Sequence, residues 1–182
     1  MNMSFGETAH RNSSLGFAMS VILKQGPLGR SWKQAGVTSE FLAEVLASHS
    51  AKSGQNYAEA RHAIVYLVNE LLENAIKFAS PGDVEIRCSL EESRFELAVI
   101  NSISPDLMPK FQALIAELTS RDPGELLIER IEANAADETS SASGLGILTL
   151  MNDYGALMGW TFSDAPTGGA IVLRTQACLS LT

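Results

Sequence analysis

The chain has 182 residues, a formal net charge of −8 and 46% hydrophobic residues, which is typical of one soluble domain with a substantial core. The 13 Lys and Arg residues are scattered, which argues against a nucleic-acid partner. No apolar run is long enough to span a membrane, and no signal peptide is recognisable. We therefore expect a cytoplasmic protein with no membrane partner.

Sequence patterns divide the chain into a polar terminus and one folded unit. Residues 1–14 predict a flexible N-terminus, so a single domain is expected over residues 15–182. The expected elements in chain order are a strand over 15–24, helices over 38–50 and 57–79, strands over 83–89 and 94–100, helices over 105–118, 124–133 and 144–154, and strands over 158–163 and 169–177. Thr38 or Ser39 is expected to cap the first helix. This order predicts an α+β fold, a two-layer sandwich of a mixed sheet with helices on one face.

The helix over 57–79 carries a polar stripe beside its apolar face. At 100° per residue, Glu70, Glu73, Asn74 and Lys77 fall on a stripe about 100° wide. A Mg²⁺–triphosphate site needs such groups: a metal ligand, a cation for a phosphate, and a carboxylate to orient or deprotonate an attacking group. A solvated helix face with pairs such as Glu73–Lys77 gives the same stripe, so spacing alone leaves both interpretations open.

A glycine motif, Gly144-Leu145-Gly146, opens the helix expected over 144–154. Glycines before a helix let backbone N–H groups approach phosphate oxygens, and the helix dipole favours an anion there. A flexible linker that enters a helix has the same composition, so the motif alone decides nothing. The preceding small and polar segment, residues 134–143, is expected to form a mobile lid.

Together the two motifs resemble a known family. Residues 70–78, ELLENAIKF, look like the N-box of the GHKL ATPases, which include histidine kinases and anti-sigma-factor serine kinases. Residues 144–147, GLGI, look like the second glycine box of that family. The closing strands resemble its last hairpin, so the resemblance covers about residues 57–177. The chain looks closest to stand-alone kinases of the anti-sigma-factor or SiaB type.

The resemblance implies a Bergerat-type fold that binds ATP and Mg²⁺. Asn74 would bind the Mg²⁺, Lys77 would contact a phosphate, and Glu70 would act as the general base. The backbone at residues 144–146 would lie beneath the phosphates.

The strand over 94–100 departs from the family pattern at its end. Many members have an Asp followed by glycines, whereas this chain has NSISP from Asn101 to Pro105. Asn101 continues the inward parity of the strand, so its amide oxygen can accept a hydrogen bond from the adenine amine, more weakly than a carboxylate does. Ala170 stands where the family often has a supporting Thr.

Two functions remain open. The first is a small ATP-dependent Ser/Thr kinase that phosphorylates a regulatory partner protein, with Glu70 activating the acceptor hydroxyl. The second is a degenerate, non-catalytic interaction module that acts by partner binding, which Asn101, Ala170 and the absent glycines favour. The family resemblance also makes a homodimer an option.

Overall fold

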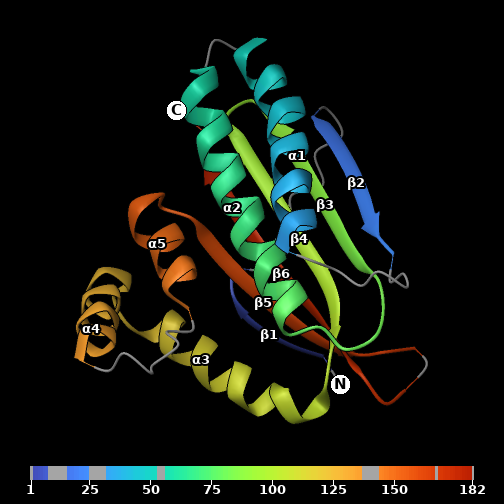
Figure 1. The fold of residues 1–182 in the computed structure, drawn as a ribbon, viewed down its shortest axis with the longest axis vertical. Coiled ribbons are helices and arrows are strands. Elements are labelled where there is room, and N and C mark those ends of the chain that lie inside the picture. The colour runs from blue at the N-terminus through green and yellow to red at the C-terminus, as the bar shows by residue number, and fades with distance from the viewer. Residues whose placement is uncertain are drawn as a thin grey trace.

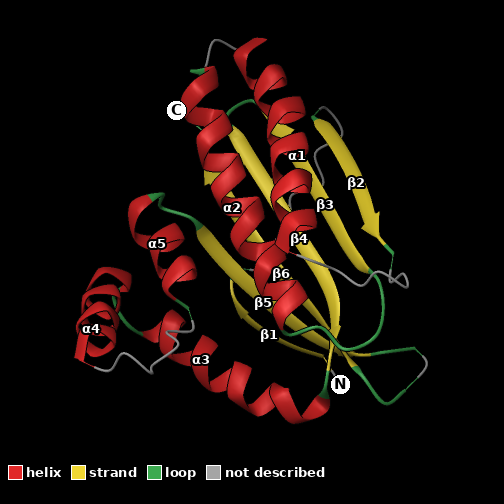
Figure 2. Ribbon diagram, in the orientation of Figure 1, coloured by secondary structure: helices red, strands yellow, loops and turns green. Residues whose placement is uncertain are grey.

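The computed structural model describes residues 2–7, 16–24, 32–52, 56–136, 144–166 and 168–181. These residues form two layers, a six-stranded sheet and a set of helices that cover one of its faces (Figures 1 and 2). The strands are β1 (Asn2–Gly6), β2 (Phe17–Leu23), β3 (Val84–Glu91), β4 (Arg94–Ile103), β5 (Leu157–Asp164) and β6 (Ile171–Ser180). The helices are α1 (Trp32–Lys52), α2 (Tyr57–Lys77), the short η1 (Pro105–Leu107), α3 (Met108–Ser120), α4 (Pro123–Ala136) and α5 (Leu145–Asp153). The expected α+β two-layer sandwich is confirmed.

The strand order in the sheet is β1-β5-β6-β4-β3-β2, and each neighbouring pair is antiparallel. We expected a mixed sheet, and the structure corrects this. Helices α3, α4 and α5 connect β4 to β5, and a connection of this length can join parallel neighbours. β4 and β5 do run in the same direction, but β6 lies between them and is antiparallel to both. The crossover therefore creates no parallel pair.

Strand β1 corrects the expectation of a flexible terminus over residues 1–14. Asn2–Gly6 pairs with β5 along its whole length and forms one edge of the sheet. The ring of Phe5 packs edge-on against Phe162, with 6.0 Å between the ring centroids. Five residues are too few to show a clear strand pattern in the sequence, and the backbone hydrogen bonds that fix this strand come from β5. Residues 8–15 lie outside the described residues.

Helix α1 begins at Trp32, well before the expected start at residue 38. Ser39 is fully buried and donates a hydrogen bond of 2.8 Å to the Ala35 carbonyl oxygen one turn earlier, so it does not act as an N-cap. Ala35 itself is buried, so the helix packs against the core before it reaches Thr38 and Ser39, and these residues lie inside it.

Helix α2 matches its prediction closely and positions the polar stripe. The Asn56 side chain caps it by accepting hydrogen bonds from the backbone N–H groups of Ala58 and Glu59. Helices α1 and α2 lie side by side along the sheet, while α3, α4 and α5 gather at one flank (Figure 1). The core lies between the layers and includes fully buried side chains from both, among them Leu46, Ile64, Leu67, Ile86, Phe95, Leu97 and Phe162. None of the helices in the described ranges is long and apolar enough to cross a membrane.

Candidate functional site

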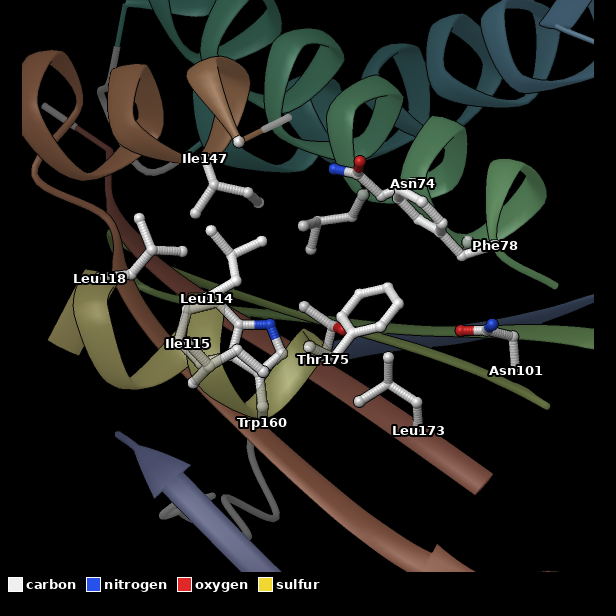
Figure 3. Close-up of a pocket in the computed structure, with 14 residues that line it drawn as sticks. Asn74, Phe78, Asn101, Leu114, Ile115, Leu118, Ile147, Trp160, Leu173 and Thr175 are labelled. Atoms are coloured by element: carbon white, nitrogen blue, oxygen red, sulfur yellow. The ribbon is translucent and has the colours of Figure 1, made fainter. Parts of the chain in front are cut away.

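A pocket of about 50 Å³ lies where α2, α3 and the start of α5 meet the inner face of the sheet (Figure 3). Its lining residues are Leu71, Asn74, Ala75, Phe78, Asn101, Phe111, Leu114, Ile115, Leu118, Gly144, Ile147, Trp160, Leu173 and Thr175. Three of the sequence-predicted residues, Asn74, Asn101 and Gly144, are therefore brought together in one pocket, although they lie in α2, β4 and the turn before α5.

Asn101 is the buried polar group at the floor of this pocket, with 4% of its surface exposed. Its side-chain Nδ2 donates a hydrogen bond of 3.4 Å to the backbone oxygen of Ser102. The amide oxygen faces the other lining side chains (Figure 3). One donor of the amide is thus used within the strand, and the oxygen is the atom offered to an occupant of the pocket.

Thr175 is a polar pocket residue that the sequence reasoning missed. It lies on the inner face of β6 opposite Val99, two residues beyond the Leu173 that pairs with Asn101. The available signal was a Thr among the inward positions of β6, where the other residues, Ile171, Leu173, Ala177 and Leu179, are apolar. Ala170, the position compared with the family, precedes β6 and is not among the lining residues.

Three aromatic side chains from different elements form much of the apolar wall. Phe78 follows α2, Phe111 belongs to α3 and Trp160 to β5. The Phe78 and Phe111 rings meet edge to face, with centroids 5.0 Å apart. Flat aromatic walls with a few polar groups are typical of sites for planar ligands. Phe111 and Trp160 escaped prediction because only tertiary packing brings them to α2.

Glu70 and Lys77 lie on the same helix as Asn74 but do not line the pocket. We expected Glu70, Asn74 and Lys77 to point into one cavity, but of the three only Asn74 lines this pocket. Lys77 is exposed, and its Nζ lies 5.2 Å from the centre of the Phe78 ring. Phe78 is itself a lining residue, so Lys77 stands at the border of the pocket.

Glu70 packs against the glycine motif. The carboxylate lies so near the Cα of Gly146 that a Cβ at that position would overlap it. Burial, and secondarily the negative charge of Glu73, raise the pKa of the Glu70 carboxyl above its ordinary value. A carboxyl whose pKa is raised in this way accepts a proton nearer neutral pH, which suits a general base.

The glycine motif begins α5 with a left-handed turn. Gly144 has a φ of 96° and occupies the N-cap position without a capping side chain, and Leu145 and Gly146 are the first residues of the helix. The guanidinium of Arg130, from α4, packs directly against Gly144. The lid expected over residues 134–143 falls mostly outside the described residues, since α4 extends to Ala136.

The residues present suit Mg²⁺ held jointly with a phosphate ligand rather than a metal site built by protein alone. Within the described ranges, no group of three or more His, Cys, Asp or Glu side chains is placed to hold a metal ion. Mg²⁺ commonly uses one or two protein oxygens, with phosphate oxygens and water completing its shell. Asn74, a lining residue on α2, carries a side-chain amide oxygen of the kind that this role requires.

The fold has a counterpart among solved structures. A chain in the crystal structure of the SiaB–SiaC complex from Pseudomonas aeruginosa superposes with a TM-score of 0.61 over 87% of this chain and 89% of that chain. The two sequences are 15% identical, so the likeness establishes a shared fold. No protein-family model matches the chain, and no curated protein matches it.

Proposed function

We propose that this protein binds ATP and Mg²⁺ in the pocket between α2 and the sheet, and that it is a Ser/Thr kinase for a small regulatory partner protein. One observation carries the proposal: Asn74, Asn101 and Gly144, each singled out for a different part of a nucleotide site, line the same pocket. A chance set of motifs has no reason to converge in this way.

Each residue takes one part of the proposed site. Asn101 would accept a hydrogen bond from the exocyclic amine of adenine, since its amide oxygen faces the pocket. The aromatic side chains of Phe78 and Trp160 would flank the base. The phosphates would lie toward Gly144, where the N-terminus of α5 favours an anion.

The groups for transfer chemistry lie next to this position. Asn74 would hold Mg²⁺, which neutralises phosphate charge when bound. Glu70, with its raised pKa, would accept the proton of the acceptor hydroxyl. The Glu70 carboxylate contacts Gly146, so it lies beside the glycine motif.

The proposed partner rests on the structural neighbour. The matching chain comes from a complex of two proteins, SiaB and SiaC, and the fold is shared over most of both chains. We infer by analogy that this chain also acts on a partner protein and has a regulatory role.

The second candidate is a non-catalytic interaction module with the same fold. The pocket favours it in one respect, because about 50 Å³ is small beside the roughly 300–1,000 Å³ of common small-molecule sites. A nucleotide therefore requires side chains of α3, such as Phe111 and Leu114, to move outward.

Titration with ATP separates the two candidates. The protein should bind ATP in a calorimeter more tightly with Mg²⁺ than without it. The fluorescence of Trp160, which lines the pocket, provides an independent measurement of binding. In a Trp32→Phe variant Trp160 is the only tryptophan, and its fluorescence should change when ATP binds. If neither heat nor fluorescence responds to ATP, the interaction module is the better account.

A further inference from the structure

Arg130 of α4 brings a guanidinium to the glycine motif. Its Nη1 lies 2.8 Å from the point that a Cβ on Gly144 would occupy, and Leu114, which lines the pocket, is the next side chain there. The Arg130 side chain is 20% exposed. Gly144 is thus required for the close approach of a guanidinium as well as for its left-handed backbone.

Glu117 of α3 holds Arg130 in this position. The Nη2 of Arg130 lies 2.8 Å from one carboxylate oxygen of Glu117, whose side chain is 42% exposed. Arg121 lies 3.9 Å from the other oxygen of Glu117 and is also bound to Glu129 at 2.5 and 2.9 Å. Glu117 therefore keeps a cation nearby if Arg130 changes its partner, so the exchange costs little.

The negative charge around the glycine motif would repel a phosphate ligand unless a cation lies nearby. The chain carries a net charge of −8, and the Glu70 carboxylate already lies against Gly146. A polyphosphate that enters at the start of α5 meets this carboxylate at short range. Lys77 is at the other side of the lining, over Phe78. A planar guanidinium binds phosphate oxygens in a paired geometry that an ammonium lacks.

We propose that Arg130 is a phosphate-binding residue, which leaves Glu117 for the terminal phosphates when a nucleotide binds. In the free protein, the Arg130–Glu117 pair then acts as a latch between α4 and α3, and polyphosphate opens it. This inference rests on the proposed nucleotide function. It assigns to the Arg130 guanidinium the task of distinguishing a triphosphate from a nucleoside.

The test compares ligands that share the base and differ in phosphate. Arg130→Gln should weaken ATP binding by about tenfold, weaken ADP binding less, and leave adenosine binding unchanged. Glu117→Gln removes the competing carboxylate and should tighten ATP binding by a few-fold, again with no effect on adenosine. Arg87→Gln is the matched control, because it breaks an exposed ion pair with Glu85 on β3, a strand that does not line the pocket, and its ATP affinity should equal that of the wild type.

The outcomes are distinct. A folded Arg130→Gln protein that binds ATP as the wild type does overturns the role of Arg130 and leaves the proposed function intact. Equal losses for ATP and adenosine make Arg130 a structural residue and also overturn it. If Arg130→Gln does not fold, Glu117→Gln decides, since unchanged ATP affinity contradicts the latch. A wild-type protein that binds adenosine and ATP equally overturns the phosphate role, and one that binds neither overturns both proposals.

Discussion

The carboxylate of Glu70 lies against the Cα of Gly146, in space that any side chain at residue 146 would need. This contact joins the polar stripe of α2 to the glycine motif at the start of α5. Ala is normally favoured over Gly within a helix, and the packing of Glu70 explains why a glycine stands in the first turn of α5.

Gly146→Ala should therefore destabilise the protein, although Ala is the better helix former. Overlap with the carboxylate costs about 1–3 kcal/mol, against a gain of roughly 1 kcal/mol in helix propensity. We expect the free energy of unfolding to fall by up to about 2 kcal/mol, measured by urea unfolding. In a Glu70→Ala background, the same substitution should become neutral or stabilising. Equal destabilisation in both backgrounds would mean that the contact does not explain the glycine.

Glu70 should make stability depend on pH. Because burial and Glu73 raise its pKa in the folded state above the ordinary 4.5, ionising Glu70 costs stability. The cost is absent below about pH 4.5, grows as pH rises toward the folded pKa, and is complete above it. Glu70→Gln should therefore be more stable than the wild type near pH 8, by a margin that shrinks toward about pH 4. Urea unfolding of both proteins across that range measures the margin, and a constant difference would contradict the shift.

Asn101→Asp tests the proposed adenine contact. A charge-assisted hydrogen bond exceeds a neutral one by about 1 kcal/mol, so ATP binding should tighten roughly five-fold in calorimetry. Without ligand the variant should melt at a lower temperature, because Asn101 is buried and a carboxylate cannot donate to the Ser102 oxygen. A lower melting temperature with no ATP binding by either protein would instead favour the interaction module.

Asn74→Ala tests the proposed Mg²⁺ contact. The variant should lose about tenfold or more in ATP affinity when Mg²⁺ is present and little when it is absent. Paired titrations with Mg²⁺ and with a chelator measure this difference. Equal losses under both conditions would show that Asn74 contacts the nucleotide in another way.

The sequence predicted the elements that carry strong local patterns. Helix α2 was recoverable because it is long, amphipathic and bounded by Asn56 and a proline turn. The alternation of β4 correctly placed Asn101 on the inner face. In contrast, β1 and the first turns of α1 depend on partners elsewhere in the chain. Their own residues therefore do not indicate a strand or a helix.

The lining of the pocket was predictable for residues that belong to a local motif and not for residues that tertiary packing brings there. Asn74 and Gly144 belong to local motifs, and both line the pocket. Thr175, Trp160 and Arg130 reach the site through strand register and helix packing, which single-sequence periodicity does not report. The direction of Lys77, over Phe78 and outside the lining, likewise depends on a side-chain conformation that spacing does not fix.

The place of β6 in the sheet has a consequence for how the chain is made. β6 is the last strand in the described sequence, yet it lies in the interior between β5 and β4. As the ribosome releases the chain, β4 emerges long before Ile171–Ser180, so one of its edges has no native partner during that interval. Unpaired strand edges readily join other chains, and such distant pairings form slowly. We therefore expect the nascent protein to be most prone to aggregation between the synthesis of β4 and that of β6, and slower translation of this stretch to lengthen its exposure.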